Sequence, residues 1–175
     1  GIGEGSAKVK LPAREAWIYE TPHPGDARMA PRARLRRRSH DKDEHLLDAA
    51  RSVLARRYRP QWHSVGAALR GSSGKIYAAV NLNARYVGRV DVCAEAVALG
   101  MAIAAGEKGI DTIVAVQRAR PGGRGQSARI VPPCGVCREM FNDYAPTMTV
   151  LLPGPKGSLV RRRARDLIPE RYVDA

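Results

Sequence analysis

Three cysteines and one glutamate form the pattern in this sequence that is best suited to chemistry. Cys93 is followed two residues later by Glu95, and the pair Cys134 and Cys137 lies further along the chain. Three thiolates can hold a tetrahedral Zn²⁺ and leave its fourth position open to water, which is the arrangement of a catalytic zinc site. Because Cys134 and Cys137 are three residues apart, one turn at the start of a helix brings both sulfurs to one metal.

The position of Glu95 indicates a role beside the metal rather than on it. It is too close in sequence to Cys93 to reach the same ion comfortably, so we expect its carboxylate to contact the water instead. Cys93 must then come from the start of a second helix, where the partial positive charge of the N-terminus stabilises a thiolate. With Pro133 before Cys134, the chain matches the pattern Cys-x-Glu followed by Pro-Cys-x-x-Cys, which is typical of zinc-dependent nucleobase deaminases.

The Cys-x-x-Cys pair by itself has two other interpretations. It is also found in thioredoxin-like redox sites and as half of a structural zinc site. A redox pair has no need of Cys93 and Glu95 upstream, and a structural site needs a fourth ligand, for which His63 is the nearest candidate. The spacing leaves both alternatives open.

Length and composition indicate one globular domain. The chain has 175 residues, of which 44% are hydrophobic, enough for a single core. No apolar run is long enough to span a membrane, and residues 1–30 lack the apolar segment of a secretory signal. Three cysteines do not suggest a disulfide framework, so we expect a cytoplasmic protein. The net charge of +13 favours encounter with phosphate-bearing partners, although the arginines are spread along the chain.

Residues 1–40 are predicted to be a basic, proline-containing extension in loop or disordered conformation, because no hydrophobic period is sustained there. Within it, Met29 is a candidate start of the native chain. The catalytic domain is predicted to cover residues 41–175.

The hydrophobic pattern of this domain predicts helices and strands in the order α-β-β-α-β-α-β-β-α. The predicted elements are a helix from 41 with Asp41 or Asp43 as its cap, a hairpin over 63–69 and 75–80, a helix over 92–105, a strand over 111–116, a helix from 134 to before 146, strands over 148–152 and 158–162, and a short helix over 165–168. This order predicts an α/β fold, a three-layer α/β/α sandwich with one mixed five-stranded sheet.

With these motifs in place, residues 41–173 resemble the cytidine deaminase family, especially blasticidin S deaminase and related bacterial nucleoside deaminases. The resemblance is carried, in the family's order, by Val65-Gly-Ala-Ala-Leu69, Val80-Asn81, Cys93-Ala-Glu95, Pro133-Cys-Gly-Val-Cys-Arg138 and Asp166-Leu-Ile-Pro-Glu-Arg-Tyr172. It implies the fold predicted above, one Zn²⁺ per subunit on Cys93, Cys134 and Cys137, and a homotetramer, or a dimer, with sites near subunit interfaces.

The resemblance also implies a reaction and its substrate contacts. Glu95 is implied as the catalytic residue that moves protons from water to N3 of the pyrimidine and to the departing amine, so that ammonia is released. The backbone near Ala94 and Cys134 is implied to contact the groups at C4, Asn81 to bind the sugar, and Tyr172 to reach toward the base from a neighbouring subunit. The implied substrate is cytidine, deoxycytidine or a blasticidin S-like cytosine nucleoside.

Three positions depart from the pattern of cytidine deaminases. Asn83 stands where a glutamate grips the ribose, which indicates a sugar part unlike plain ribose. His63 stands where a phenylalanine often packs on the base. Ala96 stands where three-cysteine enzymes often have arginine to offset the thiolate charge, and we expect Arg138 to supply this charge compensation at the zinc site.

Two rival functions are weighed against a nucleoside deaminase. A deaminase of cytosine in single-stranded nucleic acid would suit the positive charge and the run Arg34–Arg38, but the chain has only one Phe, two Trp and six Tyr on which to stack bases. A zinc-stabilised binding protein without catalysis would have no use for Glu95. The sequence gives no indication of a membrane partner.

Overall fold

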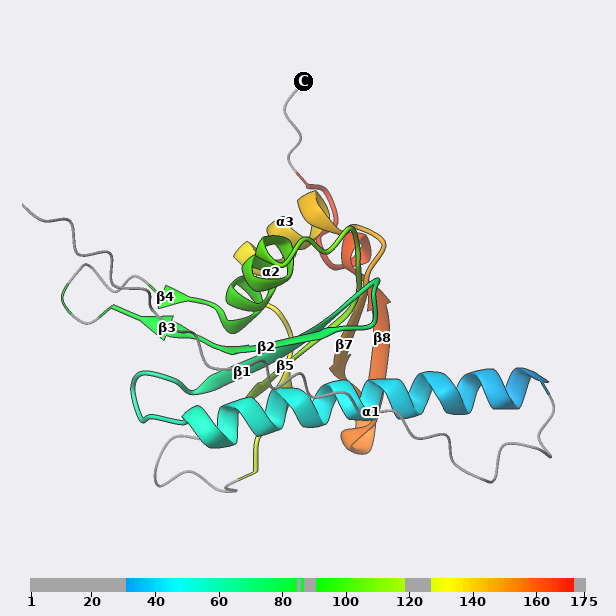
Figure 1. The fold of residues 1–175 in the computed structure, drawn as a ribbon, viewed down its shortest axis with the longest axis horizontal. Coiled ribbons are helices and arrows are strands. Elements are labelled where there is room, and N and C mark those ends of the chain that lie inside the picture. Colours follow the sequence, from blue (N-terminus) through cyan, green and yellow to red (C-terminus); the bar gives the residue numbers. More distant parts are fainter. Residues whose placement is uncertain (1–30, 85, 87–90, 119–126, 172–175) are drawn as a thin grey trace, which may run out of the picture.

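The computed structural model describes residues 31–84, 86, 91–118 and 127–171, with the backbone alone at 31–36 and 38 (Figure 1). The central sheet has the strand order β2-β1-β5-β7-β8, and the short strand β6 also pairs with β5. The strands are β1 Val65–Gly71, β2 Ile76–Val80, β5 Ile110–Gln117, β6 Arg129–Val131, β7 Thr149–Pro153 and β8 Leu159–Arg163. β5 and β7 run parallel, whereas the other pairs are antiparallel. The predicted mixed sheet is confirmed, and β6 adds a sixth strand to the expected five.

Helices cover both faces of this sheet, as the three-layer prediction requires (Figure 1). Helix α1, Pro31–Arg57, packs on one face, and α2, Ala94–Ala104, and α3, Gly135–Tyr144, pack on the other. Successive residues of β5 serve the two layers alternately, because side chains alternate along a strand: Ile113 joins the α2 and α3 core, and Val114 joins the α1 core. Gly66 allows α1 to approach β1 closely, since a Cβ there would lie 2.8 Å from the carbonyl oxygen of Ala50.

The start of α1 corrects one prediction. Residues 31–40 were expected in the loop extension, with the helix capped at Asp41 or Asp43, but α1 begins at Pro31. Proline suits the first turn of a helix, and the arginines and alanine that follow are good helix formers. The first turns of α1 therefore form although they have no hydrophobic period. Residues 1–30 lie outside the described part of the chain, and the domain boundary at residue 41 stays a prediction.

The other predicted elements lie close to their expected places. Helix α2 ends just before Gly106, whose φ of 80° gives the left-handed turn that stops a helix. Two short 3₁₀ helices, η2 Pro155–Gly157 and η3 Ala164–Leu167, precede and follow β8. The two-residue strands β3 Leu82–Asn83 and β4 Asp91–Val92 were not predicted, and they form a small antiparallel pair of their own.

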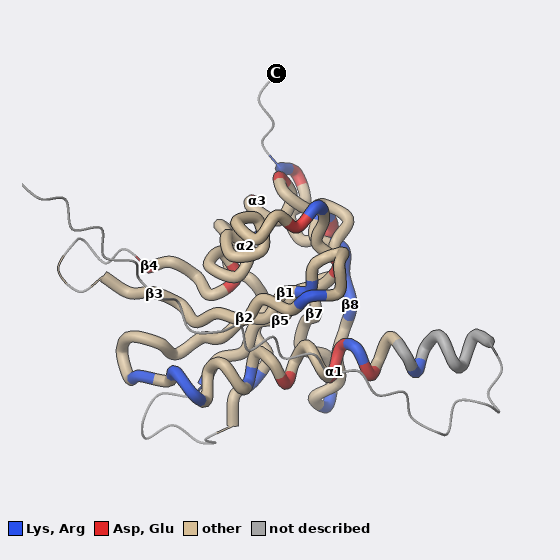
Figure 2. Tube along the Cα trace, in the orientation of Figure 1, with Lys and Arg blue, Asp and Glu red and all other residues tan. Residues whose placement is uncertain are grey.

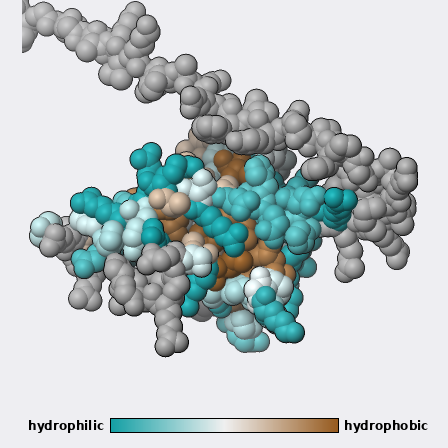
Figure 3. Space-filling model, turned by 90° about the horizontal axis from the view of Figure 1, so that it is seen from below, coloured by the Kyte–Doolittle hydropathy of each residue, from teal (hydrophilic) through white to brown (hydrophobic). Residues whose placement is uncertain are grey.

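Charge and hydropathy are unevenly distributed over these layers. Basic residues lie on α1 and β8, whereas α2 and β2 carry no Lys or Arg (Figure 2). The face on the α1 side is largely hydrophilic around an apolar area (Figure 3). Among the described residues, no helix combines the length and apolar character needed to cross a membrane.

Candidate metal centre and the pocket beside it

The first residues of α2 and α3 bring the three cysteines together. Cys93 is the N-cap of α2 and Cys134 the N-cap of α3, and both have an extended backbone. Cys137 lies one turn into α3 and is buried. The three Sγ atoms all lie within 4.8 Å of one another, and those of Cys93 and Cys134 are 3.4 Å apart.

This cluster fits a zinc ion. Tetrahedral bonds of about 2.3 Å from zinc to sulfur place sulfurs about 3.8 Å apart, close to the separations here. Among the described residues, the group of donors that can share one metal consists of these three thiols, and His63, the alternative fourth ligand, is not part of it. Three protein ligands with an open position are the arrangement of a catalytic site rather than a structural one.

Without a metal, two of the three thiols favour their neutral form. Burial raises the pKa of the Cys93 thiol to about 11, and the neighbouring thiol of Cys134 adds to this. Burial and the negative charge of Glu95 raise the pKa of Cys137 as well. Only for Cys134 do hydrogen bonds, first from the backbone N–H of Cys137, outweigh burial and lower the pKa. A divalent cation would reverse this balance, because coordination deprotonates a thiol.

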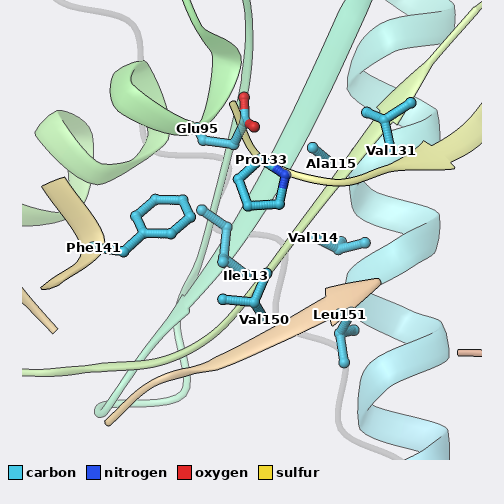
Figure 4. Close-up of a pocket in the computed structure, with 9 residues that line it drawn as sticks. All are labelled: Glu95, Ile113, Val114, Ala115, Val131, Pro133, Phe141, Val150 and Leu151. Carbon is cyan, nitrogen blue, oxygen red and sulfur yellow. The ribbon is translucent and has the colours of Figure 1, made fainter. Parts of the chain in front are cut away.

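Glu95 lies in the first turn of α2 with only 5% of its surface exposed. Burial raises the pKa of its carboxyl group. Behind it is a small cavity of about 10 Å³, and the described residues that line this cavity are apolar apart from Glu95 (Figure 4). On its other side Glu95 lines a larger pocket together with Cys93 and Cys134. A buried carboxyl group with a raised pKa beside a metal centre is suited to taking up and releasing a proton.

The larger pocket has a volume of about 360 Å³, within the range of small-molecule sites. Its walls come from the start of β1, the β3 and β4 pair, the end of β5 and the loop before α3. Besides the metal-centre residues, its polar lining residues are Ser64, Asn81, Asn83, Asp91 and Gln117. The pocket therefore combines the candidate metal centre with a set of polar side chains.

Asn81 is buried, and its side chain makes four hydrogen bonds within the protein. Its Oδ1 accepts from the backbone N–H groups of Ser64 and Val65, each at 2.9 Å. Its Nδ2 donates to the carbonyl of Trp62 at 2.9 Å and to Oδ1 of Asn83 at 2.8 Å. These bonds use its full capacity, so Asn81 holds the start of β1 in place, and the predicted sugar contact requires one of them to be exchanged.

Asn83 and His63 are tied to the same segment. Nδ2 of Asn83 donates to the carbonyl of Gln61 at 3.0 Å, which leaves Asn83 one N–H and one lone pair for a ligand. Nδ1 of His63 lies 2.7 Å from the carbonyl oxygen of Asn81 and must carry the proton, since a carbonyl only accepts. His63 is next to Ser64 but is not one of the described lining residues, so its predicted contact with the base is not formed by the pocket wall itself.

Arg138 joins the metal loop to the C-terminal segment. Its guanidinium donates to the carbonyl of Pro133 at 3.0 Å and to that of Leu167 at 3.1 Å. Further along, Arg171 pairs with Glu139 and Asp143 on α3. The segment that leads to Tyr172 is thus fastened to α3, and Tyr172 itself lies outside the described residues.

Asp91 and Gln117 are pocket residues that the sequence analysis did not single out. Asp91 belongs to a two-residue strand, which is too short to show a hydrophobic period. Its place two residues before Cys93 was the one available signal. Ala94, by contrast, is where it was expected, fully buried at the first position of α2 between Cys93 and Glu95.

Comparison with known proteins agrees with this site. Residues 40–152 match the family model described as the cytidine and deoxycytidylate deaminase zinc-binding region. A blasticidin-S deaminase of Bacillus cereus is 44% identical over 132 residues, covering 75% of this chain and 93% of that protein. A probable cytidine deaminase of Dictyostelium discoideum is 30% identical over 130 residues, covering 72% of this chain and 80% of that protein. The crystal structure of a cytidine deaminase from Burkholderia pseudomallei superposes with a TM-score of 0.59 at 29% identity, covering 74% of this chain and 98% of that one.

Proposed function

Because this chain belongs to the cytidine and deoxycytidylate deaminase family, we propose that it is a zinc-dependent hydrolytic deaminase. In this reaction a cytosine nucleoside is converted to its uracil form and ammonia is released. The observation that carries the proposal is the meeting of three sulfurs within 4.8 Å of one another, beside a buried Glu95 that lines the same pocket.

The metal would be held by Cys93, Cys134 and Cys137 at the positive ends of α2 and α3. When bound, zinc supplies the Lewis acidity that makes water a nucleophile near neutral pH. Glu95 takes the proton of the attacking water and delivers it to N3 of the pyrimidine, while the water oxygen bonds to C4. It then carries the remaining water proton, from the new hydroxyl at C4, to the exocyclic amine, so that the C4–N bond breaks, a carbonyl forms at C4 and ammonia leaves. The apolar cavity behind Glu95 keeps its carboxyl group poorly hydrated, which supports this shuttle role.

The remaining site residues are assigned by the same proposal. The backbone near Ala94 and Cys134 contacts the groups at C4, Asn81 and Asn83 shape the sugar side of the pocket, and His63 contacts the base. Tyr172 contributes from a neighbouring subunit. Arg138 offsets the thiolate charge, and its bond to the carbonyl of Pro133 supports this by holding the guanidinium on the loop that carries Cys134.

We favour a nucleoside over a polynucleotide as the substrate. The relative that is 44% identical is a blasticidin-S deaminase, which supports a small cytosine nucleoside, including one with an unusual sugar part. The pocket volume of about 360 Å³ also suits one nucleoside. Cytidine, deoxycytidine and blasticidin S-like nucleosides are all included.

We also propose a homotetramer. The outer face of α2 exposes Gly100, Met101, Ile103 and Ala104, with Met101 and Ile103 exposed by 44% and 47%. A helix that is apolar on all sides is normally covered, so a second copy of the chain is the proposed cover. Light scattering on the zinc-loaded protein tests this, and a monomer would contradict it.

The three free cysteines of the site suit a reducing compartment, and on that ground we propose a cytoplasmic location.

Ammonia release from a panel of cytosine compounds tests the activity. We expect zinc-loaded protein to deaminate at least one of cytidine, deoxycytidine and blasticidin S, and to leave a single-stranded oligonucleotide unchanged at low and at high salt. Deamination of the oligonucleotide alone would replace the nucleoside proposal with the nucleic-acid alternative. No ammonia from any compound would contradict both.

A further inference from the structure

The described lining of the pocket beside the metal centre differs in charge from the chain as a whole. The chain carries a net charge of +13, yet none of the described residues that line the pocket is Lys or Arg. Two of them are acidic, Glu95 and Asp91. Glu95 is buried at the metal centre, whereas Asp91 is exposed on β4 and its side chain has no ion-pair or hydrogen-bond partner among the described residues. The carboxylate of Asp91 is therefore available to a ligand.

The strand pairing places Asp91 on the wall where the sugar side of a nucleoside would lie. Asp91 pairs directly with Asn83 across the β3 and β4 ladder. Residues directly opposite each other in an antiparallel pair project from the same face, so both side chains stand on one wall of the pocket. Asn83 keeps one N–H and one lone pair, and Asp91 adds two oxygens that only accept.

From this juxtaposition we infer that Asp91 determines which substituents the pocket accepts on the sugar side of the substrate. Its carboxylate accepts hydrogen bonds from hydroxyl groups and, more strongly, from ammonium groups, and it repels phosphate. The enzyme is thus selective for neutral and cationic cytosine nucleosides against cytosine nucleotides. This inference rests on the proposed deaminase function and extends it to the charge of the substrate.

The test compares cytosine nucleosides that differ in one group only. In a 5′ series and in a 3′ series, the hydroxyl is kept, replaced by an amino group, or carries a phosphate. We expect kcat/KM of the zinc-loaded enzyme to fall from amino to hydroxyl to phosphate in at least one series. Asp91→Asn should reduce the amino-to-phosphate ratio about tenfold or more, because a hydrogen bond to a charged group is lost. Asp91→Lys should invert the order.

Asp48→Asn is the matched control. It removes the same charge from an exposed position of α1, on the other face of the sheet, and should leave the ratio unchanged. Because the Asp91 side chain is exposed and has no partner within the described part of the chain, its variants should unfold at the temperature of the parent protein. An amino-to-phosphate ratio that stays within twofold of the parent in both series overturns the inference.

Failure of the proposed function would be seen separately. If the parent enzyme releases ammonia from none of these compounds, the deaminase proposal fails. Binding affinities for the same series are then measured by titration calorimetry. The amino-to-phosphate ratio of these affinities is compared between Asp91→Asn and the parent protein. The role of Asp91 is therefore tested whichever way the activity assay ends.

Discussion

On the α1 face of the sheet, Arg70 is buried among carboxylates and hydrogen-bond acceptors that stabilise its positive charge. Its guanidinium donates at 2.9 Å to the Oδ2 of Asp111, to the carbonyl of Lys42 and to Oγ1 of Thr112, and it lies 3.8 Å from the buried carboxylate of Asp43. On the opposite face, Cys93, Cys134 and Cys137 bring together three groups of the same kind, with the carboxylate of Glu95 nearby.

The two clusters differ in what completes them. Around Arg70, carboxylates and neutral acceptors satisfy the charge and the N–H groups of the guanidinium, so the group serves to join α1 to β1 and β5. The cysteine cluster is electrostatically incomplete, since its thiols cannot all ionise until a cation balances their charge. A cluster whose charges are balanced by other residues of the chain has a structural role. A cluster of like groups at one point is a binding site for an ion or ligand that balances them. Substitutions in the two clusters should therefore affect different properties.

The largest expected effect follows from Cys134→Ala. Two thiols cannot hold zinc as three do, so zinc content should fall from one ion per chain to a small fraction of it, as measured by inductively coupled plasma mass spectrometry. Ammonia release should fall on the order of a thousandfold or more, because zinc supplies several kcal/mol of the catalysis. Val136→Ala, on the same turn of α3 and exposed, is the control and should keep both. Retention of zinc by Cys134→Ala would contradict the three-thiol site.

Glu95→Gln should separate catalysis from metal binding. The change keeps the shape of the side chain but removes the proton shuttle, so kcat should fall by about 10² to 10⁴ while zinc content is unchanged. Burial raises the pKa of Glu95, so its ionised form destabilises the fold as pH rises through that pKa. The neutral variant should therefore unfold at pH 7 at an equal or higher temperature than the parent, when both are zinc-free. Full activity in the variant would remove Glu95 from the mechanism.

The cysteine cluster could be predicted from the sequence, whereas much of the pocket around it could not. Cys93, Glu95 and Cys134 were identified because metal chemistry and helix geometry allow few spacings, and the alternation of apolar residues fixed the order of the layers. The start of α1 was missed because the polar residues before Asp41 show no hydrophobic period, although they are good helix formers.

Contacts between distant segments were also beyond the sequence. Asp91 reaches the pocket through its pairing with Asn83, and Arg138 reaches Leu167 through the packing of η3 on α3. Neither contact has a local pattern, because each depends on where the sheet and helices bring separate parts of the chain. The internal hydrogen bonds of Asn81 are a third example, since they arise from the turn that leads into β1.

Substitutions in the cluster around Arg70 should change the stability of the protein rather than its activity. Arg70→Met leaves the buried carboxylate of Asp43 with Arg161 alone, and its Oδ1 already lacks a hydrogen bond among the described residues. We expect a loss of about 3 kcal/mol in the free energy of unfolding, measured by urea denaturation, with zinc content unchanged. Arg51→Met, which removes the exposed pair with Asp48, should change the stability by less than about 1 kcal/mol. Equal effects of the two changes would contradict the structural role of Arg70.

Arg138 has both a structural role and a role beside the metal centre, and its substitution should have the smallest effect. It satisfies the carbonyls of Pro133 and Leu167 within the chain, and it places a positive charge on the loop of Cys134. Arg138→Ala should lower kcat about tenfold and zinc content less, since a lost hydrogen bond to a charged group is worth about 1.5 kcal/mol. If charge is what matters, Arg138→Lys should restore kcat. If the bridge between the two carbonyls is what matters, lysine should fail, because a single ammonium does not reproduce the planar guanidinium. Unchanged kinetics in Arg138→Ala would exclude both roles.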